Sequence, residues 1–166
     1  MLPEPIRDAQ FMAMVGGGRP AYGRTMDVAA LRNFCLGFPG AYEDFPFGPE
    51  TSVFKVRAST AGGTRWEAKM FALSAMDPDD WSVSLKCEPA LAEQLRKAHP
   101  EITGGWHLNK NHWNTVRLDG ALPDSTVRDM VEDSYDLVVS GLTRKQQEQL
   151  GWARLVREGS AWTARP

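Results

Sequence analysis

The sequence of 166 residues has few of the features that mark the more specialised classes of protein. Its two cysteines, Cys35 and Cys87, are too few and too far apart for a disulfide framework or a CxxC metal site. No apolar run approaches the roughly 18 residues of a membrane helix. The first ten residues also lack the cationic and apolar regions of a secretory signal. We therefore expect a cytoplasmic protein without a membrane-spanning segment.

The sequence also lacks an excess of positive charge, because its formal net charge is −2. Domains that bind nucleic acid usually have a basic excess, so such binding here would need positive charge concentrated in one place. Hydrophobic residues make up 42% of the chain and include six Trp and seven Phe, a content that excludes global disorder. The length suits one domain with a core and is too short to predict two.

The ends of the chain carry weaker patterns than its middle. Residues 1–25 include three consecutive glycines and no apolar face, which predicts a flexible N-terminal tail. Met26 is an alternative start of the native protein, so whether residues 1–25 belong to it is left open. We expect one domain over residues 26–145 and a C-terminal extension, helical in part, over residues 146–166.

Periodicity within the domain predicts three helices and four strands. Asp27 and Pro89 are typical of helix starts, and Gly141 is typical of a helix end. The predicted helices lie between Asp27 and Pro39, over 89–98 with Leu91, Leu95 and Ala98 as the apolar stripe, and over 123–140. The predicted strands are 52–57, 69–74, 81–86 and 113–118, with an acidic and aromatic loop at 42–49 and a long hairpin connection at 58–67.

This order, α-β-β-β-α-β-α, favours a single-domain α+β fold, because consecutive strands with short links pair antiparallel. We expect the helices to pack on one face of the sheet and to leave the other face in solvent.

One segment, residues 104–115, differs chemically from the rest. All three histidines of the protein lie between positions 99 and 112, and two Trp, three Asn and one Lys lie beside them. No Asp or Glu occurs from Ile102 to Leu118. Functional side chains are common on loops that a rigid scaffold holds. The candidate site residues are Trp106, His107, Asn109, Lys110, His112, Trp113, Asn114 and Arg117, with Lys86 across the sheet.

The run from Gly105 to Gly120 resembles the MmcQ/YjbR family, and four other segments do so in the same order: 38–48, 69–73, 85–87 and 133–138. The resemblance implies an α+β fold with an antiparallel sheet, similar to the CyaY-like and secretion-chaperone-like folds and described as a double-wing arrangement. Members of the family are commonly labelled DNA-binding, and the family brings no enzymatic activity to carry over. The tail, the insertion at 58–67 and the extension after residue 145 depart from its pattern.

DNA binding is the leading hypothesis. The solvated sheet face would present Lys55, Arg57, Lys86, Thr115 and Arg117 without acidic partners, beside Lys110 and His112. We expect Lys86, Lys110 and Arg117 to contact phosphates, Trp113 to stack on bases, and Asn109 and Asn114 to donate hydrogen bonds. The alternative is structural: the cations only solubilise the sheet, and the Asn and His side chains satisfy the loop backbone. Burial of Asn109, His112 and Asn114 would favour that alternative.

Other functions have less support. The spacing of the histidines matches no ligand motif even with Cys87 added, so we expect neither a metal nor a cofactor. There is no GxSxG and no carboxylate pair beside the histidines, so we expect a non-enzymatic protein.

The runner-up to DNA binding is a protein-interaction adaptor of secretion-chaperone-like fold with a purely structural loop. Its apolar contact would be Phe45-Pro46-Phe47, although we expect these aromatic rings to cap the core. The oligomeric state is left open.

Overall fold

The computed structural model describes residues 26–60, 62–119 and 121–152. The predicted N-terminal tail and residues 153–166 of the predicted extension lie outside the described residues. The helices are α2 (Val28–Leu36), α3 (Pro89–Ala98), α4 (Asp124–Ser140) and α5 (Arg144–Gln149). The strands are β1 (Ala41–Asp44), β2 (Ser52–Ser59), β3 (Trp66–Ser74), β4 (Ser82–Lys86), β5 (Ile102–Gly104) and β6 (Trp113–Arg117).

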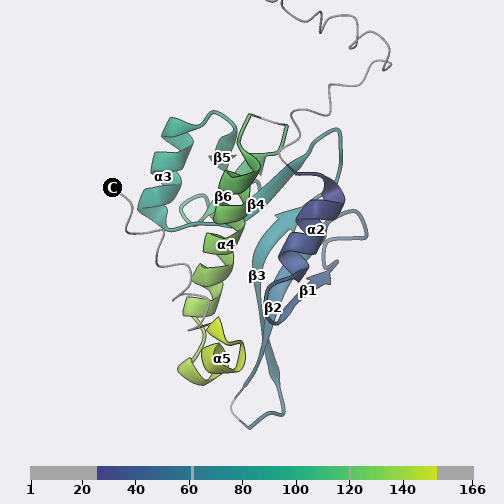
Figure 1. Ribbon diagram of the computed structural model, residues 1–166, viewed down its shortest axis with the longest axis vertical. Helices are drawn as coiled ribbons and strands as arrows, with labels where there is room; N and C mark the ends of the chain where they lie inside the picture. The colour runs from purple at the N-terminus through teal and green to yellow at the C-terminus, as the bar shows by residue number, and fades with distance from the viewer. Residues whose placement is uncertain (1–25, 61, 120, 153–166) are drawn as a thin grey trace, which may run out of the picture.

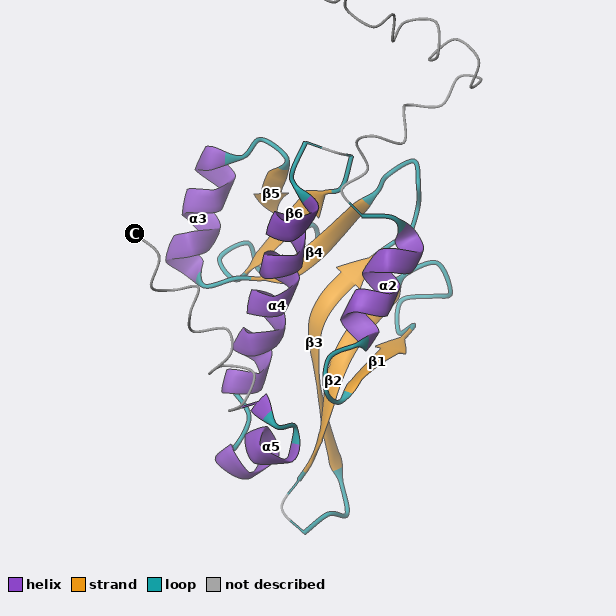
Figure 2. Ribbon diagram, in the orientation of Figure 1, coloured by secondary structure: helices purple, strands orange, loops and turns teal. Residues whose placement is uncertain are grey.

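The six strands form one antiparallel sheet in the order β1-β2-β3-β4-β6-β5. Helices α2 and α4 both lie on the same face of this sheet, and α3 lies beside α4 (Figure 1). The opposite face carries no described helix, and we call it the open face (Figure 2). The predicted single-domain α+β fold is therefore confirmed, with two short strands and one short helix added to the predicted order. Among the described residues, no helix has the length and apolar character that a membrane crossing requires.

The additional strand β1 occupies part of the segment predicted as an acidic loop. Carboxylates are unfavourable in strands, but both acidic side chains of β1 find partners here. Glu43 accepts hydrogen bonds from Arg32 Nε at 3.1 Å and from Ser52 Oγ at 2.6 Å. Asp44 accepts one from Lys55 Nζ at 2.6 Å. These tertiary contacts outweigh the local propensity, so the prediction of a loop over residues 42–49 was wrong at residues 42–44.

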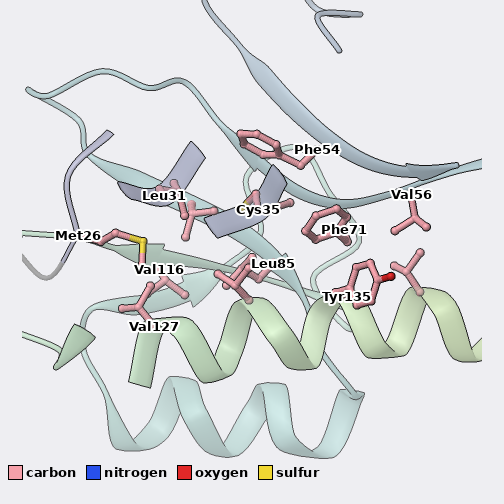
Figure 3. Packing of buried hydrophobic residues seen from close by; sticks show 14 of the residues in the cluster. Met26, Leu31, Cys35, Phe54, Val56, Phe71, Leu85, Val116, Val127 and Tyr135 are labelled. Atoms are coloured by element: carbon pink, nitrogen blue, oxygen red, sulfur yellow. The ribbon is translucent and has the colours of Figure 1, made fainter. Parts of the chain in front are cut away.

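The core lies between the helices and the sheet. Figure 3 shows side chains from α2 and α4 packed against those of the strands. The largest fully buried side chain is Tyr135 of α4. Its ring stacks on Phe38 at 4.5 Å and meets Phe71 edge-on at 5.5 Å, and its hydroxyl donates to the Pro39 carbonyl at 2.7 Å. Tyr135 therefore joins α4 to β3 and to the segment that follows α2.

A buried hydroxyl completes the seam between β3 and β4. These strands share two residue pairs, Ala72 with Leu85 and Leu73 with Ser84. If the register continued by one residue, Lys86 would pair with Phe71. Instead, Ser134 of α4 accepts a hydrogen bond from Lys86 N at 2.8 Å and donates one to Phe71 O at 2.5 Å. The Ser134 hydroxyl therefore bridges a backbone donor and a backbone acceptor that would otherwise form a hydrogen bond between β3 and β4.

Strands β2 and β3 pair as far as Ser59 and Trp66, further than predicted. The connection is consequently a turn closed by Thr60 N donating to Arg65 O at 2.8 Å, not a loop from 58 to 67. The paired strands extend past the end of the rest of the sheet (Figure 2). This hairpin includes the segment in which the sequence departs from the family pattern.

Two other predictions need correction. In α3, Leu91 is exposed and Ala92 is the buried residue, because the helix packs on β6 through the Ala92 side. The predicted boundary at residue 145 falls inside α5, which begins with a capping box between Thr143 and Gln146. Gln146 is buried, and Trp152 donates to Asp136 at 2.9 Å. The packed part of the domain therefore continues to Trp152.

Candidate nucleic-acid interface

The register of the strands fixes which side chains share the open face, because directly paired residues point to the same side of a sheet. Lys86 pairs with Trp113, Ser84 with Thr115, and Ser82 with Arg117. The Ser84 and Thr115 hydroxyls lie 2.8 Å apart, which confirms that they share a face. Lys86 and Arg117 therefore lie on the open face at opposite ends of the β4–β6 pair, about 13 Å apart at a rise of about 3.3 Å per residue.

The connection from β5 to β6, residues 105–112, forms a compact loop at the Lys86 end of this pair. Its base closes where Gly105 N donates to Trp113 O at 2.9 Å. A Cβ on Gly105 would lie 2.8 Å from the Cβ of Trp113, so the close approach requires glycine. His107 has a φ of 54°, a left-handed conformation that is uncommon outside glycine. The loop therefore has a defined shape and is held by its own backbone.

Several predicted site residues are exposed on this loop. Trp106 has 76% of its surface exposed, and its ring meets that of His107 edge-on at 4.8 Å. The alkyl chain of Lys110 packs over Gly104, where a Cβ would lie 3.2 Å from it, so the Lys110 side chain is held against the end of β5. The remaining exposed members are Asn109 and His112. An indole, an ammonium group and two imidazoles are thus presented to solvent by one loop.

The asparagines of the segment have structural roles. Asn114 is 3% exposed and lies on the helix side, where it donates to Ala92 O at 3.3 Å and accepts from Arg96 at 2.8 Å. It attaches α3 to β6 and is not available on the open face. Asn109 is exposed, and its side chain accepts from Asn111 N at 3.0 Å, a local bond that shapes the loop. The structural alternative therefore explains the role of Asn114. It explains only one hydrogen bond of Asn109, whose side chain remains exposed.

The open face is not free of carboxylates, contrary to the prediction. Lys55 is paired with Asp44 on the neighbouring strand. Arg117 pairs with Asp119, which follows β6 after one residue. These two cations are partly neutralised by their partners. Lys86 and Lys110 form no ion pair with any described residue. Lys86 carries the positive charge at the loop end of the open face, whereas Lys110 packs on Gly104, which pairs with Asn114 and faces α3.

A second group of residues on the open face was missed from the sequence. The Arg57 guanidinium lies 4.7 Å from the Tyr42 ring centre and 5.7 Å from that of Trp66. Trp66 is 63% exposed. The available signal was alternation along the hairpin: with the strands paired to Ser59, Trp66 falls on the same face as Arg57. Assigning residues 58–67 to a loop concealed this relation.

Two clefts among the described residues contain titratable groups. A cleft of about 20 Å³ between α3 and α4, lined by Cys87 and Asp133, has room for one water molecule. Burial, with Asp136, Asp129 and Glu132 nearby, raises the pKa of Asp133 to about 6. Burial also raises the pKa of the Cys87 thiol, which keeps it protonated and weakly nucleophilic at neutral pH.

An open cleft of about 530 Å³ between α2, the segment before β2 and the segment after β3 is lined by Arg32, Ser52 and Asp77. Arg32, the cation in this lining, already donates a hydrogen bond to Glu43, and Ser52 donates to the same carboxylate. Arg32 and Ser52 therefore already share one carboxylate partner. Among the described residues, no group of three or more potential metal ligands occurs, the three histidines included.

The aromatic residues before β2 differ from their predicted role. Phe45 is 45% exposed and Phe47 is 67% exposed, so these rings do not cap the core. The chain turns outward after β1 at residues 45–48, where Gly48 N donates to Phe45 O at 3.2 Å. This turn points the rings to solvent and leaves an apolar surface beside β1.

Comparison with known proteins identifies relatives of this chain. A family model described as YjbR matches residues 36–137. The uncharacterized protein YjbR of Escherichia coli strain K12 is 34% identical over 125 residues, which cover 75% of this chain and 98% of that protein. The uncharacterized protein YbdF of Escherichia coli O157:H7 is 34% identical over 119 residues, which cover 72% of this chain and 89% of that protein.

Solved structures show the same fold. The Deinococcus radiodurans protein DR2400, whose domain is described as DUF419, matches with a TM-score of 0.68 and 39% identity over 78% of this chain and 91% of that chain. A protein from Pseudomonas syringae matches with a TM-score of 0.50 and 26% identity over 68% of this chain and 99% of that chain. The resemblance seen in the sequence motifs is thereby confirmed, and the chain belongs to the YjbR family.

Proposed function

We propose that this protein is a non-enzymatic DNA-binding module whose contact surface is the loop 105–112 together with the adjoining end of the open face. The observation that carries the proposal is the exposed Trp106 on a shaped loop, with Lys86 on the open face and Lys110 on the loop itself. These two cations lie at the same end of the sheet and form no ion pair with any described residue. Lysines contact phosphates, and exposed indoles stack on bases.

Roles within this surface differ from residue to residue. Lys86 and Lys110 bind phosphates, and Arg117 contributes less because Asp119 competes for its guanidinium. Trp106 and Trp113 supply aromatic area, and His107, His112 and Asn109 supply hydrogen-bonding groups at the rim. Asn114 supports the surface from behind by attaching α3 to β6. Binding of this kind is electrostatic and weakly specific, because phosphate contacts carry no sequence information.

The test is fluorescence anisotropy with labelled single- and double-stranded DNA at low and physiological salt. The wild type is compared with a Lys86→Ala, Lys110→Ala, Arg117→Ala triple variant. The charge-matched control is Lys97→Ala, Arg128→Ala, Arg144→Ala, which removes three exposed cations from the helices. We expect micromolar binding that weakens with salt, is lost in the first variant and is retained in the control. Equal loss in both variants, or no binding at low salt, would contradict the proposal.

A protein partner is the second candidate, because the exposed Phe45 and Phe47 form an apolar surface away from the loop. A Phe45→Ser, Phe47→Ser variant should then lose a partner that the wild type and the first triple variant both retain in pull-downs. Loss of the same partner from the loop variant would place the contact elsewhere.

A further inference from the structure

The Tyr42, Arg57 and Trp66 side chains form a continuous stack on the open face, and we propose that this stack binds single-stranded DNA. We call these three residues the stacked patch. The inference rests on the proposed DNA-binding function and adds both a second contact surface and the form of DNA that occupies it.

The stacked patch is built by the register of three strands. Tyr42 pairs with Lys55, two residues before Arg57 on the same face of β2. Trp66 pairs with Ser59, two residues after Arg57. The aromatic rings therefore approach the guanidinium from both directions along the hairpin, at 4.7 Å and 5.7 Å. Contacts of this type hold a guanidinium in place without consuming its hydrogen-bond donors.

The chemistry of the patch matches an anionic chain with accessible base faces. Arg57 is exposed and forms no ion pair with any described residue, so its N–H groups are available to a phosphate. Trp66 is 63% exposed, which leaves much of its ring to a stacking base. The carboxylates nearest in the register, Asp44 and Glu67, are each bonded to a lysine and do not repel the ligand.

These features favour a single strand over a duplex. In a duplex the base faces are stacked on one another, and only base edges and phosphates are presented to a protein. An exposed indole beside a guanidinium gains most from a base that has been freed from its neighbours. The hairpin that carries the patch extends past the rest of the sheet (Figure 2), and the patch lies on its open face, which carries no described helix.

The experiment measures anisotropy of a labelled oligothymidine of about 15 nucleotides and of a duplex of the same length. The variants are Trp66→Ala and Arg57→Lys, with Phe47→Ala as the matched control because Phe47 is an exposed aromatic residue outside the patch. Trp66→Ala should weaken single-strand binding by at least about fivefold and duplex binding by less than about twofold. Arg57→Lys keeps the charge but loses the planar group, so it should also weaken single-strand binding preferentially.

Separate outcomes address the two proposals. If the Lys86, Lys110, Arg117 triple variant loses DNA while Trp66→Ala and Arg57→Lys bind the oligothymidine like the wild type, the stacked patch is not a binding surface and the loop proposal stands. If only the patch variants lose binding, the patch is supported and the loop proposal fails. An RNA oligouridine that competes at least about tenfold better than the oligothymidine would overturn the assignment of DNA, because such a preference requires contacts to the 2′-hydroxyl that only RNA has.

Discussion

The buried hydroxyl of Ser134 gives the sharpest test of the fold. It is fully buried and accepts from Lys86 N while donating to Phe71 O, so Ser134→Ala leaves one backbone donor and one backbone acceptor without a partner. Each unsatisfied buried group costs about 1–3 kcal/mol, and partial relaxation of the seam recovers some of this. We expect the free energy of unfolding to fall by about 3 kcal/mol and the Tm by about 10 °C for a domain of this size.

The assay is equilibrium unfolding in urea followed by far-UV circular dichroism. The slope with denaturant should stay constant while the midpoint falls, because the surface buried in the native state is unchanged. Ser140→Ala is the matched control: its hydroxyl donates to Leu137 O at the exposed end of the same helix, and we expect a change below about 0.5 kcal/mol. A loss below about 1 kcal/mol for Ser134→Ala would show that β3 and β4 close directly and that the hydroxyl does not bridge them.

Two other changes have distinct expected outcomes. Asp133 titrates near pH 6 in the folded protein and near 3.8 when unfolded, so the folded state holds the extra proton between these values and loses stability as the pH rises through them. Because the side chain is only half-buried, we expect Asp133→Asn to stabilise by about 1 kcal/mol at pH 8 and hardly at all at pH 4, measured as Tm in thermal scans. Asn114→Ala removes the bonds to Ala92 and Arg96 and should cost about 1–2 kcal/mol in urea unfolding while DNA affinity stays within about twofold.

The results that contradict these two predictions are equally specific. An Asp133→Asn effect of the same size at both pH values would mean that the carboxyl is not perturbed by its surroundings. A large loss of DNA affinity in a stably folded Asn114→Ala protein would mean that Asn114 reaches the ligand despite its burial.

Alternation along the strands predicted much of the fold, because one face of each strand is covered by helices and the other is not. It placed Arg57 and Arg117 on the open side, where the structure has them exposed. It missed β1, whose carboxylates are tolerated only because Arg32 and Lys55 reach them from other elements. Contacts between distant segments of this kind leave no local pattern in a sequence.

Within the candidate site, composition identified the loop but did not assign roles to its members. Trp106 and Asn114 belong to the same polar and aromatic run, yet one is 76% exposed and the other 3%. The difference arises from the strand register, which turns Asn114 toward α3. Trp66 was missed because the hairpin pairs two residues beyond the point where the alternating pattern ends.

The seam at Ser134 also divides the open face into two parts. The stacked patch lies on β1, β2 and β3, whereas Lys86 and the loop lie on the β4–β6–β5 side, and the two sides share only two residue pairs. Helix α4 packs across both sides and supplies the hydroxyl that joins them (Figure 1). A β3–β4 pairing of two residue pairs resists twisting less than a longer pairing does. The angle between the two surfaces therefore depends on how α4 packs against the sheet. The affinity for a strand of DNA that contacts both surfaces would therefore depend on that angle. Residues of α4 that never touch the DNA would then affect how well one strand spans the two surfaces.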